Sequence, residues 1–450
     1  MSSRYKNIVN LNPKQYKVAA SIKRNLFFVG GVGGGKTFIG AMWTLKRATL
    51  VGSLGLITAP VSDTLTNSTL PALMDAWSRV GIYEGEHYVI GTRPPESWDV
   101  KPYAHRNGKI LTWRWGSYVI IDGSDNFNKH RGVELDYVYI DEYRDVKKDA
   151  YSVYDGRLRG KAVKALGRRS EATGHVYQIL ATTTPPDDPN IIRRHVGDNT
   201  EIVYATSYDN QANLPEGYID SLKSNYDQLT FDREVLGKLV DISGQLTYYA
   251  FNPQINVAHK DFDASRALWL AWDFNSSTTK PMSTLAVQEH DGKYYVVKEF
   301  IHRDSNTYQQ SEVISQWLQE SKFGGELTIT GDYSGKRKES NASKSDYAII
   351  EEYLGGYKDY RERTRPTRSI RDRVASLNAM FRNTIGEHRM FVSPTCERLI
   401  DDLNNTKWKE SGAVLDDSDP MRTHPSDALS YFTYNFFPLV GRRTTTSEQS

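Results

Sequence analysis

The sequence predicts an α/β protein of two domains, the first built on a parallel sheet and the second on a mixed sheet. Three observations predict this class. Apolar strand-like runs alternate with helical patterns in the first half, as parallel sheets require. In the second half, two strand-like runs meet at Asp291-Gly292, a pair favoured by tight hairpin turns. The 450 residues also exceed what one hydrophobic core usually holds.

Composition narrows the classes of protein to which the chain can belong. Its hydrophobic share of 38% and formal net charge of +2 fit a folded protein whose nucleic-acid contacts come from local clusters. The single cysteine, Cys396, cannot form an internal disulfide, which suits a reducing compartment such as a cytoplasm. The amino-terminal residues lack a signal-peptide core, and no run reaches about 18 apolar residues. We therefore expect neither export nor membrane insertion.

The segment LFFVGGVGGGKT, residues 26–37, has the pattern of a complete phosphate-binding loop. In such a loop, glycines let backbone N–H groups surround phosphate oxygens, a lysine reaches the β- and γ-phosphates, and a hydroxyl holds Mg²⁺. The residues that fit these roles are Gly30, Gly33, Gly35, Lys36 and Thr37. The helical pattern that follows would place the phosphates at a helix N-terminus, where the dipole favours anions.

A second motif, YVYIDEY at 137–143, supplies the acids that ATP hydrolysis needs. Asp141 would bind Mg²⁺, and Glu142 would orient the attacking water. A strand that ends in Asp-Glu is common by itself. Its position about a hundred residues after a phosphate loop makes it specific.

Further candidates for the nucleotide site depend on weaker signals. Arg131 is the candidate arginine finger, with residues 157 and 159 as rivals, and an ordinary surface arginine is the alternative for each. Thr182 and Thr183 end a predicted strand at 176–186, where they would either sense the γ-phosphate or simply cap the strand. Gln15 would hydrogen-bond adenine or lie in solvent.

The composition changes at 241–253, which places the domain boundary at residue 245, and the second domain at 246–440 carries three separated aspartates. Asp273 ends an apolar run that reads as a buried strand, Asp332 ends a later strand, and Asp427 lies in the first turn of a late helix. This order resembles the ribonuclease-H-like nucleases, in which carboxylates hold two Mg²⁺ or Mn²⁺ ions. Glu299 would be either an auxiliary ligand or a surface carboxylate. Residues 441–450 read as a flexible tail.

The phosphate loop with its Asp-Glu partner, followed by the three acids, resembles the large terminase family of tailed double-stranded DNA bacteriophages across nearly the whole chain. The residues that match are Gly30, Gly35, Lys36, Thr37, Asp141, Glu142, Asp273, Asp332 and Asp427. Many members carry an arginine inside the loop, whereas residues 31–34 here include no basic side chain.

The resemblance implies a DNA-packaging motor. It implies an ATPase domain of the ASCE type at 1–245, with a lid subdomain at 190–245, followed by a nuclease that cuts concatemeric viral DNA. The implied cofactors are ATP with Mg²⁺, and Mg²⁺ or Mn²⁺ at the nuclease. The implied partners are double-stranded DNA, the procapsid portal and a small terminase subunit. A homo-oligomeric ring would form on docking, with a monomer in solution left open, in the cytoplasm of the infected host cell.

Two basic segments, 335–344 and 361–373, are the predicted contacts to DNA phosphates, with a solvated charged face as the alternative for each. Two rival functions also fit the sequence. One is a helicase-like ATPase whose second domain binds DNA without cutting it. The other is an assembly protein that binds nucleotide as a structural switch. Metal-dependent cleavage and ATP turnover separate these possibilities.

Overall fold

The computed structural model describes residues 9–439 apart from 104–108, 243, 276–278, 339–343, 368, 411 and 413. The predicted tail at 441–450 and the centre of the basic segment 335–344 therefore lie outside the described residues. Two compact units divide the chain, one of residues 1–216 and 232–240, the other of residues 217–231 and 241–450. Residues 217–231, which the sequence placed in the predicted lid, thus pack with the second unit. None of the described helices has the length and hydropathy that crossing a membrane would require.

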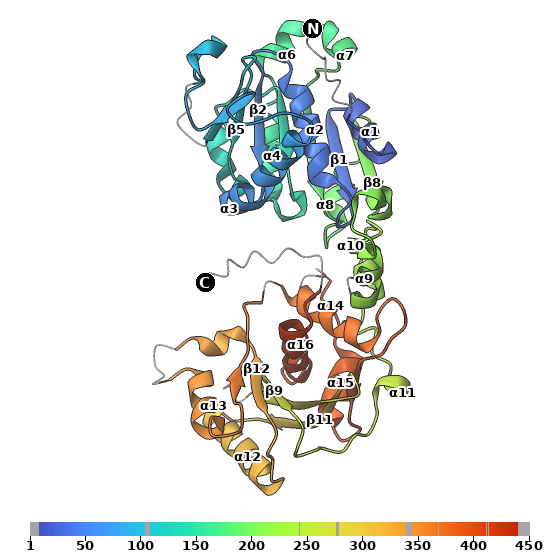
Figure 1. Cartoon of the computed structure of the whole chain (residues 1–450). Coiled ribbons are helices and arrows are strands. Elements are labelled where there is room, and N and C mark those ends of the chain that lie inside the picture. The colour runs from blue at the N-terminus through green and yellow to red at the C-terminus, as the bar shows by residue number, and fades with distance from the viewer. Residues whose placement is uncertain are drawn as a thin grey trace. The chain divides into compact units, whose positions relative to one another are not determined.

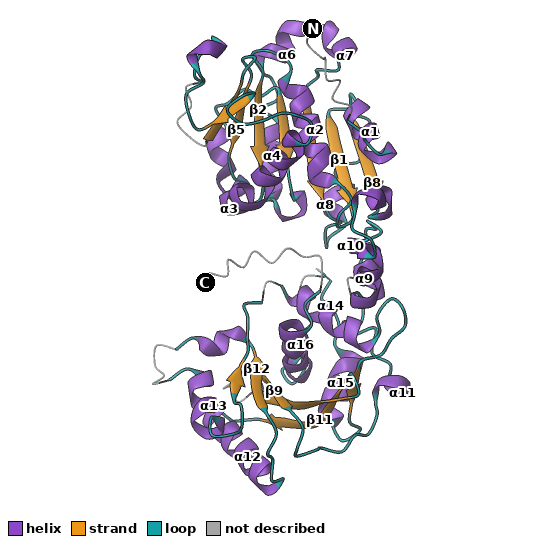
Figure 2. Cartoon of the chain, in the orientation of Figure 1, coloured by secondary structure: helices purple, strands orange, loops and turns teal. Residues whose placement is uncertain are grey.

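The first unit contains a twisted sheet in the order β3-β4-β5-β2-β6-β7-β1-β8 (Figures 1 and 2). The strands β5, β2, β6, β7, β1 and β8 pair with their neighbours in parallel. Strands β3 and β4 extend one edge of the sheet with antiparallel pairing, which the sequence did not predict. The strands are β1 (Asn25–Gly30), β2 (Leu54–Thr58), β3 (Tyr88–Ile90), β4 (Lys109–Trp113), β5 (Tyr118–Ile121), β6 (Tyr137–Ile140), β7 (Gln178–Thr183) and β8 (Thr200–Ala205).

Helices cover both faces of this sheet because its central strands are apolar on both faces. In β1, Leu26 and Phe28 join one core with helices α1, α2 and α4, and Phe27 and Val29 join the opposite core with α5 and α8. The helices are α1 (Pro13–Ala20), α2 (Lys36–Ala48), α3 (Ser62–Thr64), α4 (Leu70–Ser78), α5 (Lys148–Asp155), α6 (Lys161–Leu166), α7 (Arg169–Thr173) and α8 (Asn190–Arg193).

The second unit contains a mixed sheet in the order β13-β12-β9-β10-β11-β14 (Figure 2). The predicted hairpin joins β10 to β11, and its turn residues Asp291 and Gly292 have φ of 54° and 75°. The β9 strand pairs antiparallel with β10 and parallel with β12. The strands are β9 (Leu268–Asp273), β10 (Met282–His290), β11 (Lys293–His302), β12 (Leu327–Gly331), β13 (Arg361–Glu362) and β14 (Met390–Val392).

Helices also cover both faces of the second sheet. One core unites Ala271 of β9 with α14, α15 and α16, and the opposite core unites Leu270 and Trp272 with α12 and α13. The helices of this part are α9 (Tyr218–Asn225), α11 (Pro253–Asn256), α12 (Thr307–Glu320), α13 (Asp346–Leu354), α14 (Ile370–Phe381), α15 (Glu397–Asn405) and α16 (His424–Phe436), and the division between the two units falls within α10 (Gln228–Glu234). The predicted α/β class, with a mostly parallel first sheet and a mixed second sheet, is confirmed.

Candidate nucleotide and metal sites

The phosphate loop connects β1 to α2, as its sequence predicts, and it leaves no room for larger residues. Gly35 precedes α2 with a left-handed φ of 78°, and a Cβ there would lie 2.3 Å from Nε2 of Gln15. A Cβ on Gly31 would lie 2.5 Å from the carbonyl oxygen of Val235. Gln15 donates a hydrogen bond of 3.2 Å to the Gly35 carbonyl, so the structure places Gln15 beside the loop.

Two segments that are distant in the sequence, residues 205–210 and residue 234, form hydrogen bonds to this loop. Sequence reasoning missed both segments. The bonds run from Gly31 N–H to the Ala205 carbonyl (3.0 Å), from Val32 N–H to the Glu234 carbonyl (2.6 Å), from Ser207 Oγ to the Val32 carbonyl (2.6 Å) and from Asn210 Nδ2 to the Gly33 carbonyl (2.7 Å). A loop fixed at successive residues loses little further conformational entropy when a ligand binds. These contacts make the loop a preorganised cradle.

Lys36 is the first residue of α2, and Thr37 follows it in the same turn. The Nζ atom of Lys36 donates to the carbonyl oxygens of Gly30 and Gly31, at 3.1 and 3.0 Å. Burial lowers the pKa of Lys36, and the neighbouring Glu142 acts in the opposite direction. The ammonium is therefore partly desolvated, which strengthens its attraction for an anion.

Asp141 follows β6 directly, and both of its carboxylate oxygens accept hydrogen bonds from hydroxyl groups. Thr182 of β7 donates to Oδ1 and Thr69 donates to Oδ2, each at 2.8 Å. Thr69 closes a π-helical turn, Leu65–Thr69, and such turns are frequent at functional sites. Since β7 lies between β6 and β1, Thr182 joins the acidic strand to the strand of the loop.

Glu142 adopts a left-handed backbone conformation with φ of 48° at the carboxyl end of β6. Within the described residues, its buried Oε2 atom has no hydrogen-bond partner. Burial raises the pKa of Glu142, whereas Lys36 opposes the rise. A carboxylate oxygen that is buried without a partner is available to accept a proton from a bound water.

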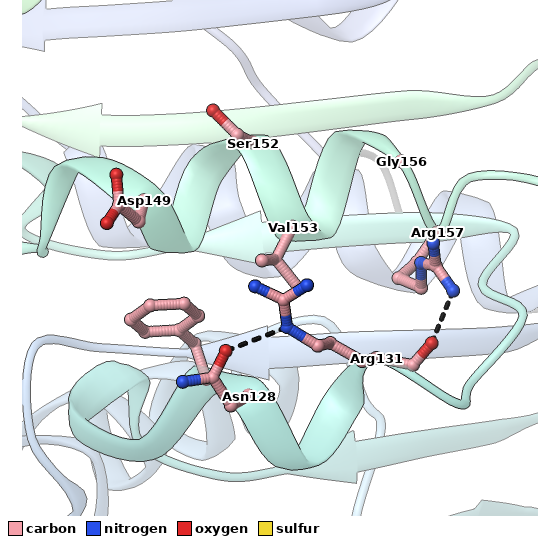
Figure 3. Close-up of a pocket in the computed structure, with 8 residues that line it drawn as sticks. Asn128, Arg131, Asp149, Ser152, Val153, Gly156 and Arg157 are labelled. Carbon is pink, nitrogen blue, oxygen red and sulfur yellow. Dashed lines mark hydrogen bonds between the residues drawn. The ribbon is translucent and has the colours of Figure 1, made fainter.

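The candidate finger residues Arg131, Arg157 and Arg159 lie away from the loop within this chain. Leu135, two residues before β6, donates its N–H to the Arg157 carbonyl at the amino-terminal end of β6, whereas the loop follows the carboxyl end of the parallel strand β1. Figure 3 shows Arg131 and Arg157 lining a pocket, with Nε of Arg131 donating to Asn128 at 2.8 Å and its carbonyl accepting from Arg157. Arg159 pairs with Glu134 at 3.4 Å. The structure therefore does not bring these arginines to the loop of their own subunit.

In the second unit, Asp273 and Asp332 emerge side by side from two neighbouring parallel strands. Asp273 ends β9 and Asp332 follows β12, and the Asp332 N–H donates to the Trp272 carbonyl at 3.1 Å. Gly331 permits this approach, because a Cβ there would lie 2.3 Å from the same carbonyl. The Asp332 carboxylate also accepts from the backbone and hydroxyl of Ser334, at 3.0 and 2.6 Å.

Asp427 comes to this region in the first turn of α16, a helix that packs on β9 and β12. Its Oδ1 accepts a hydrogen bond of 2.9 Å from Nη1 of the buried Arg373. Burial raises the pKa of Asp427 to about 6, with Arg373 opposing and Asp273 adding to the rise. Asp427 and Asp273 therefore interact as like charges, an arrangement that a divalent cation relieves.

His424 is a neighbour of Asp273 that sequence reasoning missed. Its Nδ1 lies 2.9 Å from Oδ2 of Asp273, and Asn275 donates to the same oxygen at 2.7 Å. Burial alone would lower the pKa of His424, but the hydrogen bond to Asp273 and the charges of Asp273 and Asp427 together raise it. In the part of the chain that the structure describes, no three acidic, histidine or cysteine side chains are arranged to enclose a metal ion. The three aspartates share a region, and each carboxylate is bonded to its own neighbour.

Two further carboxylates hold helices in place around this region. Glu299 of β11 accepts from the backbone N–H groups of Arg398 and Leu399, at 3.1 and 2.9 Å, and so caps α15. This contact gives Glu299 a structural task that the sequence did not reveal. The buried Asp402 accepts from the N–H groups of Thr423 and Ser426, at 2.7 and 3.0 Å, where α16 begins.

Replacing Asp402 with alanine is expected to destabilise the second unit by about 2 kcal/mol or more, because two N–H groups at a helix start lose their acceptor. Denaturant unfolding of the full chain, followed by tryptophan fluorescence, measures the change. The exposed neighbour Asp401, replaced in the same way, should shift stability by less than about 0.5 kcal/mol. Equal unfolding midpoints for the two variants would show that Asp402 does not anchor α16.

The predicted basic segment 361–373 divides into two parts with different environments. Arg363 and Arg365 stack over Phe436 and Tyr434, with the guanidinium carbon 4.7 and 4.2 Å from the ring centroids. Arg371 and Arg373 in α14 are buried, so they cannot contribute to an exposed DNA-binding face. The prediction of DNA contact therefore applies to the part before α14.

Comparisons with known proteins show which family the chain belongs to. The family model described as terminase large subunit, T4likevirus-type, N-terminal, matches residues 27–252. The chain belongs to the terminase large subunit family. The solved large terminase of a thermophilic bacteriophage is similar in fold, with a TM-score of 0.64 and 14% identity over 95% of this chain and 99% of that one.

The same thermophilic phage terminase in complex with ATP-γ-S has a TM-score of 0.61 and 16% identity to this terminase chain, with the same shares of both chains covered. No curated protein sequence matches the chain. At identities this low, the structural similarity shows only that the fold is shared. The roles of individual residues depend on the geometry described above.

Proposed function

We propose that the chain is a viral DNA-packaging motor that also cuts DNA. ATP hydrolysis in the first unit would drive double-stranded DNA into the procapsid, and a metal-dependent nuclease in the second unit would cleave concatemeric DNA. The observation that carries this proposal is the presence, in one member of the terminase family, of a braced phosphate loop facing Asp141 and Glu142 and of a separate region with Asp273, Asp332 and Asp427.

In the ATPase site, the loop amides and Lys36 would bind the phosphates, and Gln15 beside Gly35 would meet the adenine end. Thr37 and Asp141 offer the hard oxygen ligands that suit Mg²⁺, which neutralises phosphate charge when bound. Glu142 would orient the attacking water and accept its proton, using the carboxylate oxygen that has no partner in the described structure. The thermophilic phage terminase solved with ATP-γ-S supports ATP as the nucleotide.

In the nuclease site, the like charges of Asp273 and Asp427 and the adjacent Asp332 would hold Mg²⁺ or Mn²⁺. Bound ions of this kind activate water and stabilise the departing oxygen of a phosphodiester. Arg373 would keep Asp427 ionised and oriented, and His424 would do the same for Asp273. Arg363, which precedes α14, would contact the DNA backbone.

The proposed partners follow from the motor function. They are double-stranded DNA, the portal of the procapsid, a small terminase subunit and further copies of this chain in a docked ring, within the cytoplasm of an infected host cell. In such a ring, Arg131 would serve the nucleotide of a neighbouring subunit, because it lies away from the loop of its own.

The decisive experiment measures both activities of the purified full chain. Wild-type protein should release phosphate from ATP in the presence of DNA and should cut plasmid DNA when Mn²⁺ is added. Replacing Lys36 with alanine should abolish phosphate release and leave Mn²⁺-dependent cutting within about twofold, because separate sites carry the two activities. Turnover without any cutting would favour the helicase-like alternative. Nucleotide binding without turnover would favour an assembly protein that uses nucleotide as a switch.

A further inference from the structure

Negative charge predominates around the phosphate loop. Asp141, Glu142 and Glu234 all act on the pKa of Lys36, and Lys36 is the only basic residue of the loop itself. A nucleoside triphosphate adds further negative charge, and hydrolysis concentrates charge on the γ-phosphoryl oxygens. The single positive charge of Lys36 neutralises only part of this negative charge. A second cation within reach of the site would stabilise the transition state.

Arg144 is a second cation beside these groups. It lies two residues after Glu142 in the turn Tyr143–Asp145, and its N–H donates to Oγ1 of Thr183 at 3.1 Å. Its side chain is only 25% exposed. Arg144 lowers the pKa of Lys36 and acts on that of Glu142, so its guanidinium lies close enough to both to interact electrostatically.

Two carboxylates hold the guanidinium of Arg144 loosely. One is its neighbour Asp145, whose Oδ2 lies 3.5 Å from Nε of Arg144, and the other is Glu234. Nη1 of Arg144 lies 3.7 Å from Oε1 of Glu234, whereas Nε of Arg233 lies 3.1 Å from the same oxygen. The carbonyl of Glu234 also accepts the 2.6 Å bond from Val32 in the loop. Removing a partner from a buried carboxylate is costly when no other cation remains. Here Arg233 remains paired with Glu234, so Arg144 is able to move away without leaving the buried Glu234 carboxylate unpaired.

We propose that Arg144 is a catalytic residue supplied within the subunit, whose guanidinium contacts the γ-phosphoryl oxygens and returns to Glu234 between turnovers. This assignment rests on the proposed ATPase function. A guanidinium presents two parallel N–H donors to a phosphate, a geometry that a single ammonium group lacks. Thr183 fixes the backbone from which the side chain swings. Glu234 ends α10, the helix in which the division between the two units falls. The contact between Arg144 and the end of this helix would therefore change with the nucleotide that is bound.

Steady-state hydrolysis and nucleotide binding by Arg144→Ala test the assignment. We expect kcat to fall by about 100-fold to 1,000-fold while binding of a fluorescent ATP analogue changes only a few-fold. Arg144→Lys should recover part of the loss, since it restores charge without the paired donors. Arg79→Ala, which removes an exposed arginine paired with Asp75, is the matched control and should match wild type. Wild-type kcat in Arg144→Ala would overturn the assignment, whereas absence of turnover in the wild-type chain would instead reject the proposed function.

Two further measurements address the holding role of Glu234 and the source of the cation. Glu234→Gln leaves Arg144 in place and removes one of its two holding charges, so KM for ATP should fall several-fold, and an unchanged KM would overturn the holding role. An equimolar mixture of the Lys36→Ala and Arg144→Ala variants should stay inactive, because neither chain has a complete site. Recovery of hydrolysis in the mixture would show that Arg144 acts on a neighbouring subunit, contrary to the proposal.

Discussion

Glu142→Gln is expected to stop ATP turnover while ATP binding persists. Glutamine keeps the shape and the left-handed backbone position of residue 142, but its amide cannot accept a proton from the attacking water. The loss should be about 100-fold or more in kcat, the usual contribution of a positioned general base. Phosphate release and equilibrium binding of a fluorescent ATP analogue measure the two quantities separately.

The binding result is as informative as the loss of turnover. Glu142 raises the pKa of Lys36, so neutralising Glu142 leaves the lysine freer to attract phosphate, and ATP affinity should stay equal or rise. Glu171→Gln, which neutralises an exposed carboxylate of α7, should preserve both binding and turnover. Hydrolysis by Glu142→Gln at the wild-type rate would mean that another group orients the water, and the assignment of the acidic pair would then be wrong.

Local motifs of the sequence predicted the main elements well. The strand before the loop, the strand that ends at residue 140 and the hairpin at Asp291-Gly292 all lie where their patterns place them. Asp332 follows β12 and Asp427 lies in the first turn of α16, as expected. These features succeed because apolar periodicity, turn residues and glycine spacing act within a few residues along the chain.

The supporting residues of both sites were beyond sequence reasoning because distant segments supply them. Glu234 meets Val32 and Arg144 only after the chain has folded, and nothing local marks it as different from other helical glutamates. Asp402 caps a helix whose N-cap residue, Thr423, lies twenty-one residues later, so no capping pattern is visible in the sequence. Arg131 was a candidate because it lies close to Asp141 in the sequence, yet β6 runs between them, and the contact of residue 135 with residue 157 lies at the amino-terminal end of that strand.

Replacing Asp273 with asparagine is expected to lower Mn²⁺-dependent cutting of plasmid DNA by about 100-fold or more, while DNA-stimulated ATP hydrolysis stays within about twofold of wild type. Loss of an outer contact to a metal ligand already costs about 10-fold to 100-fold, so loss of a ligand charge should cost more. Asparagine keeps the size of the buried side chain at the end of β9, so the strand should remain intact. Agarose electrophoresis of nicked and linear plasmid measures the cutting.

The matched control for this variant is Asp261→Asn, an exposed aspartate of the same unit that contacts His259 at 3.0 Å. It carries the same change in charge, so nonspecific effects of charge on DNA binding should appear equally in both variants. Raising the Mn²⁺ concentration should restore part of the cutting by Asp273→Asn if the lost function is metal affinity. Asp273 is the carboxylate that connects β9 to α16 through its contact with His424, so it lies at the centre of the proposed site. Cutting by Asp273→Asn at the rate of Asp261→Asn would therefore place the nuclease site elsewhere.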